Sequence, residues 1–158
     1  MPNQSISFLV IVLTALTTGA AAPPVFQGLE FEPLPRVVGI SGEVVPMSVR
    51  VLGRFVAPDT KELTTCPLSK VKIHFEAHCQ ANPRGTQLVE YGIVGRPVVT
   101  DAQGRAEIPY VCPPRATRLL VGRYRAVYPG GPLRGVDVPR QSGDVGQLII
   151  RPKPPEAP

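Results

Sequence analysis

The residues of this chain that most suggest chemistry are two histidines and a glutamate within one alternating segment. His74, Glu76 and His78 alternate with apolar residues, so a β-strand would place all three on one face. Residues two apart lie about 6.6 Å apart along a strand, so neighbouring pairs could share a metal ion, whereas His74 and His78 lie about 13 Å apart. Because the three side chains cannot close around one ion, a solvated polar face is the preferred interpretation, and a weak zinc or copper site is the alternative.

A second candidate is a basic region in the C-terminal half. It contains arginines that are opposed in the same span only by Asp137, namely Arg115, Arg118, Arg123, Arg125, Arg134 and Arg140. A charged solvent face is the ordinary explanation of such a pattern. The functional alternative is binding of an anionic partner, such as a cell-envelope polymer or an acidic protein surface.

The sequence motifs do not indicate an enzyme. The chain has no nucleophile elbow, phosphate-binding loop or HExxH motif, and Asp101 is explained by the turn signal Asp101–Gly104. The net charge of +5, from 17 basic and 12 acidic residues, is too small to indicate the dense stripe of lysines and arginines expected of a nucleic-acid-binding protein. We therefore expect a noncatalytic protein without a cofactor and without a nucleic-acid partner.

The elements that must position these residues are predicted to be strands. The chain has 158 residues, of which 20 are proline and 15 glycine, which favours a single domain with many turns. In Lys70–Cys79, apolar and polar residues alternate without exception. The other predicted strands are Met47–Val56, Leu88–Val94 near an edge, Arg105–Cys112, Leu119–Tyr128 and Val145–Arg151.

The N-terminus has the pattern of an export signal. Phe8–Leu16 is apolar but too short to span a bilayer comfortably, and three alanines follow at positions 20–22. We expect a signal peptide over residues 1–22, cleaved after Ala20 or Ala21 because Pro23 fits signal peptidase poorly after Ala22; an uncleaved anchor or a buried element is the alternative. The protein would then be secreted, periplasmic or on the cell surface, without a stable membrane span after processing. The proline-rich segments 23–36 and 152–158 are expected to be extended and to lie outside the fold.

Three segments resemble successive strands and turns of bacterial immunoglobulin-like domains of the adhesin and invasin type. They are Lys70–Phe75, Val99–Ala106 and Val121–Gly130, and the resemblance covers roughly Val37–Arg151 in a single copy. It implies an all-β, immunoglobulin-like β-sandwich of about seven strands. Such domains occur in surface adhesins, in large secreted proteins and as accessory modules of enzymes, so the motifs indicate fold rather than function.

The resemblance also bears on the three cysteines. If the strand order follows the resembled fold, Cys79 and Cys112 lie at the same pole, which implies a disulfide between them in an oxidising compartment. Cys66 precedes the strand that ends at Cys79 and would therefore lie at the other pole. A bridge from Cys66 to Cys79 would have to span about 40 Å. Two alternatives stay open: the loop of Cys66 folds back towards Cys112, or all three cysteines are reduced.

The function expected from these observations is that of a noncatalytic secreted or cell-envelope module for binding or structural support. Its partner would be a protein or an anionic envelope polymer. The alternatives are a metal-handling periplasmic protein that uses the histidine strand and a secreted accessory or inhibitor protein that acts on an enzyme.

Overall fold

The computed structural model describes residues 21–80 and 91–155. Most of the predicted signal peptide and residues 88–90 of the predicted edge strand lie outside these ranges. Every regular element within the described ranges is a β-strand, so the prediction of an all-β protein is confirmed. The described part of the chain contains no helix that is long and apolar enough to cross a membrane.

Twelve strands form the fold over residues 21–80 and 91–155. A 4-stranded sheet has the order β1-β3-β4, with β7 also paired to β3, and a 6-stranded sheet has the order β2-β12-β8-β5-β6, with β11 paired to β8. Strands β9 and β10 form a separate hairpin. The strands are β1 (Val25–Phe31), β2 (Val37–Ile40), β3 (Val44–Val56), β4 (Leu63–Pro67), β5 (Lys72–Gln80), β6 (Gly92–Val99), β7 (Arg105–Val111), β8 (Leu120–Tyr128), β9 (Gly131–Leu133), β10 (Val136–Val138), β11 (Gln141–Ser142) and β12 (Gly146–Arg151).

One hydrophobic core receives side chains from both large sheets. Phe75 of β5 and Tyr124 of β8 are fully buried, and so is Met47 of β3, while Ile108 of β7 is nearly so. The alternation predicted for β5 is confirmed on this inward face, where Ile73 is also fully buried. Two sheets that share one core in this way fit a β-sandwich. We call this two-layer region, which contains β2, β5, β6, β7, β8, β11, β12 and the first half of β3, the body.

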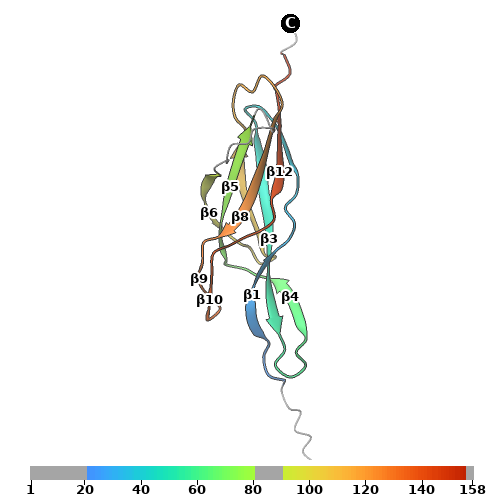
Figure 1. The fold of residues 1–158 in the computed structure, drawn as a ribbon, viewed down its shortest axis with the longest axis vertical. Helices are drawn as coiled ribbons and strands as arrows, with labels where there is room; N and C mark the ends of the chain where they lie inside the picture. Colours follow the sequence, from blue (N-terminus) through green and yellow to red (C-terminus); the bar gives the residue numbers. More distant parts are fainter. Residues whose placement is uncertain (1–20, 81–90, 156–158) are drawn as a thin grey trace, which may run out of the picture.

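Strand β3 is long enough to leave the body (Figure 1). Its first half, Val44–Arg50, pairs with β7, whereas Val51–Val56 pairs with β1 on one side, and Leu52–Val56 with β4 on the other. Figure 1 shows β1 and β4 at the end of the molecule opposite the C-terminus. We call this three-stranded extension, made of β1, Val51–Val56 and β4, the arm.

Strand β1 corrects the expectation that residues 23–36 lie outside the fold. Val25–Phe31 pairs with β3, and its side chains Phe26 and Leu29 are buried. The register shifts between Phe26 and Gly28, so the buried positions are three residues apart instead of two. This bulge removes the alternation by which a strand is ordinarily identified in a sequence.

Candidate functional site

The outward face of the β5–β8 pair carries a buried carboxylate held by two arginines. Glu76 lies directly opposite Arg125 in the antiparallel ladder, and its side chain is only 8% exposed. Arg125 donates from Nε (2.8 Å) and from its second terminal nitrogen (2.7 Å) to Glu76 Oε2. Arg140, which precedes β11, donates to Oε1 at 2.9 Å. Both oxygens of a nearly buried carboxylate are therefore satisfied, as burial of a charge requires.

Two aromatic rings complete this cluster. The Arg125 guanidinium lies 4.4 Å from the centre of the Tyr91 ring, which is within cation–π range. His78 meets the same ring edge-on, with the ring centres 4.7 Å apart. Burial and the positive charge of Arg123, its cross-strand neighbour, lower the pKa of His78 below its usual value, which favours the neutral form of the ring. Arg125 is thus fixed by a carboxylate and by the face of a ring.

The two arginines line a hollow of about 220 Å³ together with Gln141 and Ser142 of β11. Glu76 neutralises only one of the two guanidinium groups, so the cluster keeps an excess positive charge. Arg140 is 60% exposed and Arg125 is 32% exposed, and each guanidinium has more donors than its bonds to Glu76 use. The arrangement can therefore offer guanidinium, amide and hydroxyl groups to an anion. We call Glu76, Arg125, Arg140, Gln141 and Ser142 the arginine cluster.

The structure brings together only part of the predicted basic region. Arg123 and Arg125 alternate on the outward face of β8, and Arg140 reaches the same face. Arg134 instead lies at the tip of the β9–β10 hairpin, 5.8 Å from the centre of the Phe55 ring. The remaining two, Arg115 and Arg118, lie exposed in the connection between β7 and β8.

A larger hollow at the end of the body is also basic. It measures about 570 Å³ and is lined by Arg115 and Lys153 together with Ser41 and the loop that follows Pro113. Ser41 Oγ donates to Pro113 O and accepts from Ala116 N–H, both at 2.9 Å, so the loop backbone is anchored. Among the described residues, the Arg115 side chain has no hydrogen-bond or ion-pair partner. Its guanidinium group is therefore not positioned as those of the arginine cluster are.

The suggested metal site does not form on the histidine strand. Glu76, the central member of the proposed trio, accepts hydrogen bonds from arginines on both oxygens, and His78 meets the Tyr91 ring edge-on. The residues described by the structure contain no group of three or more possible metal ligands. A cation at Glu76 would have to displace two guanidinium groups, so a metal-handling role has no support from this geometry. The solvated-face interpretation is also incorrect at Glu76, which is buried.

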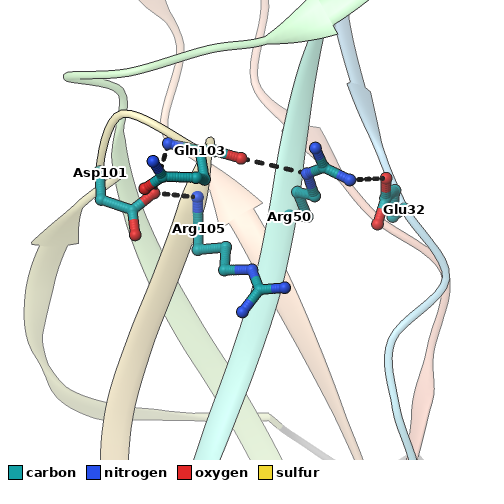
Figure 2. Close-up of polar contacts among 5 residues, drawn as sticks. All are labelled: Glu32, Arg50, Asp101, Gln103 and Arg105. Atoms are coloured by element: carbon teal, nitrogen blue, oxygen red, sulfur yellow. Dashed lines mark hydrogen bonds and ion pairs between the residues drawn. The ribbon is translucent and has the colours of Figure 1, made fainter.

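The predicted turn at Asp101, whose polar contacts are shown in Figure 2, lies beside Arg50 and Arg105, two residues that line a third hollow. Asp101 Oδ1 accepts from the backbone N–H groups of Gln103 (2.9 Å) and Arg105 (2.8 Å), so this carboxylate serves the turn, as predicted. Arg50 donates to Gln103 O and also to Glu32, each at 3.1 Å, and ties the turn to the β1–β2 connection.

The walls of this third hollow, which measures about 290 Å³, carry charges that cancel. Arg50 and Arg105 are matched there by Glu32 and Glu107. The Arg50–Glu32 pair is also about 40% exposed at both side chains. Such a hollow offers no net charge to attract an ionic ligand, and its ion pair contributes little to stability.

The structure contains no disulfide between Cys79 and Cys112, which corrects the predicted bridge. Burial, and to a smaller extent Cys79 and Cys112, raise the pKa of Tyr110 to about 12. The buried Cys112 side chain turns to β2, where its sulfur fills the space beside Gly39. Burial also raises the pKa of Cys112, which disfavours the reactive thiolate. Cys66 lies exposed on β4.

Three members of the site region were not identified from the sequence. Tyr91 had been assigned to a predicted edge strand, whereas β6 begins at Gly92. Gln141 and Ser142 fall in a polar stretch where no strand was predicted, yet they pair with Tyr128 and Val127 of β8. A strand of two residues has no periodicity of its own, so its register depends on the neighbouring strand.

Comparisons with known proteins add no relative to this description. No protein-family model, no curated protein and no solved structure matches this chain.

Proposed function

We propose that this protein is a noncatalytic, immunoglobulin-like module, secreted or held in the cell envelope, that binds an anionic partner through Arg125 and Arg140. The observation that carries the proposal is the fixed position of the two guanidinium groups on one nearly buried carboxylate. Side chains that already have a fixed position lose less conformational entropy on binding than mobile ones. Two guanidinium groups with excess positive charge in fixed positions are therefore a better anion site than mobile arginine side chains.

The immunoglobulin-like assignment rests on the sequence motifs and is compatible with the strand pairing. The core shared by two sheets is a feature that such a domain would have. Export rests on the apolar N-terminal run and the alanines that follow it. The expected partners are an anionic envelope polymer or an acidic protein surface.

Binding of a labelled linear polyphosphate to the full chain at low salt tests this proposal. Arg140→Gln removes one guanidinium group from the arginine cluster, and we expect it to weaken binding about tenfold, the effect of one charge-assisted contact. Arg134→Gln is the matched control, because it lowers the net charge equally but lies on the β9–β10 hairpin. We expect the control to weaken binding about twofold or less, through long-range charge alone.

Two results would contradict the proposal. One is an equal loss of affinity in the two variants, which would mean that only net charge matters. The other is an absence of binding to both polyphosphate and polyglutamate at low salt. Circular dichroism of each variant checks that the strand content is unchanged.

A further inference from the structure

Strand β4 is an edge strand whose protection against pairing with another chain is limited to one proline, Pro67, at its last position. Its five residues, Leu63–Pro67, are all exposed, none is charged, and its ladder with β3 has no register shift. Within the described ranges β4 pairs with β3 alone. Exposed edges normally carry charges, prolines or bulges that prevent association, and charged residues here lie only before the strand, at Lys61 and Glu62.

Four other edge strands of the described fold carry such protection. Strand β1 has a bulge at Gly28, and β6 carries a positive φ at Gly95 followed by Arg96 and Pro97. Strand β7 contains two charged residues and a proline in seven positions, and β2 has only four residues. Strand β4 is therefore the longest of the described edge strands that have neither a charged residue nor a bulge.

The hydrogen bonds at the two ends of the β3–β4 ladder fix which backbone groups of β4 point outward. Leu68 N–H donates to Val51 O at 3.0 Å, and Ala57 N–H donates to Glu62 O at 3.0 Å. In an antiparallel ladder the residues bonded to the neighbour alternate with residues whose N–H and C=O groups face away. Even-numbered positions therefore face β3, and odd-numbered positions face outward.

The outward groups are those of Leu63, Thr65 and Pro67, and they are symmetric about Thr65. If a second copy approaches antiparallel, Thr65 and its counterpart exchange two hydrogen bonds on the two-fold axis. Leu63 N–H then donates to the carbonyl oxygen of Pro67 in the other copy. Because proline has no N–H, only the carbonyl oxygen of Leu63 is left without a donor on each side of the axis. An uncharged strand introduces no like-charge repulsion into such a pair.

We propose that β4 is a self-association surface through which two copies of this chain join their arms into one continuous sheet, centred on Thr65. This proposal does not depend on the arginine cluster, which lies on the body. Because few hydrogen bonds and a small area are involved, the dimer is weak and forms at high protein concentration.

Sedimentation equilibrium of the full chain over a wide concentration range, under reducing conditions, tests the proposal. We expect the average mass to rise towards twice that of the monomer. Thr65→Pro removes the outward N–H on the axis without removing a bond to β3, so it should keep the chain monomeric. Thr65→Val retains the N–H and serves as the matched control that still dimerises. A chain that remains monomeric throughout, or a Thr65→Pro variant that associates like the Thr65→Val control, would overturn the proposal.

A cross-linking experiment tests the register without a proline. In the proposed pairing Thr64 lies opposite Cys66 of the second copy at a non-hydrogen-bonded position, where Cα atoms are about 4.5 Å apart and a disulfide fits. With oxidised glutathione, which accepts the two electrons and two protons, the Thr64→Cys variant should form covalent dimers at least about fivefold faster than the unmodified chain. Adding Cys66→Ser should abolish this gain. Equal rates for Thr64→Cys and the unmodified chain would contradict the register.

Discussion

The body and the arm use the same strand, β3, in two different environments. In the body, Met47 of β3 is covered by a second sheet and is fully buried, whereas in the arm Phe55 of the same strand is only partly buried. The arm rests on a small group of contacts, of which the Phe26–Phe55 ring pair, 5.4 Å between centres, is one. Alternating apolar residues thus predict β3 in both regions. How deeply a side chain of β3 is buried depends on whether a second layer lies opposite it.

The largest effect is expected from a cavity in the body. Phe75→Ala removes a fully buried ring from the core between the sheets and should lower the free energy of unfolding by about 3–5 kcal/mol. Urea denaturation followed by circular dichroism measures this loss. A loss below about 1.5 kcal/mol would mean that the site is less tightly enclosed than the structure indicates.

The corresponding change in the arm should cost less and act locally. Phe55→Ala removes a half-buried ring and its contact with Phe26, and we expect a loss of about 1–2 kcal/mol. Hydrogen exchange should then become faster at the amides of β1 and β4 while those of β5 and β8 are unchanged, because weakly covered segments open separately. Uniformly faster exchange across both regions would contradict the distinction between arm and body.

The smallest effect is a dependence of stability on pH that arises in the body. Because the pKa of His78 is lower in the folded than in the unfolded chain, the unfolded chain binds a proton first as the pH falls. The stability that this group contributes is therefore present above about pH 6.5, the ordinary pKa, and is lost as the pH falls through the lowered pKa of the folded chain.

Variants at the two histidines of the chain separate this contribution. The free energy of unfolding, measured by urea denaturation from pH 7.5 to 5, should fall less steeply in His78→Gln than in the unmodified chain. His74→Gln retains His78 and therefore keeps that part of the slope. A His78→Gln slope equal to that of the unmodified chain would contradict the assignment.

The sequence predicted the body better than the arm. Alternation over Lys70–Cys79 and Leu119–Tyr128 correctly identified β5 and β8, because each has one face on a core that other strands close. Strand β1 was missed because of its bulge at Gly28, and β4 because all five of its residues are exposed and no apolar face repeats.

The candidate site was only partly accessible to sequence reasoning, for a different reason. Arg125 and Arg140 were identified by residue type and charge, but Glu76 was assigned to a metal trio and a solvated face. Its partners come from a neighbouring strand and from a segment 64 positions away in the sequence, so only the pairing of β5 with β8 and β11 brings them together. Spacing along one strand carries no information about such partners.

The most direct test of the proposed function is a titration of the isotope-labelled chain with linear polyphosphate, followed by amide chemical shifts in ¹H–¹⁵N NMR spectra. We expect saturable shifts that concentrate at Arg125, Arg140, Gln141 and Ser142, since these residues line one hollow on the body. Shifts that are strongest at Arg115 or Arg134, or that spread evenly over all basic residues without saturation, would contradict the account.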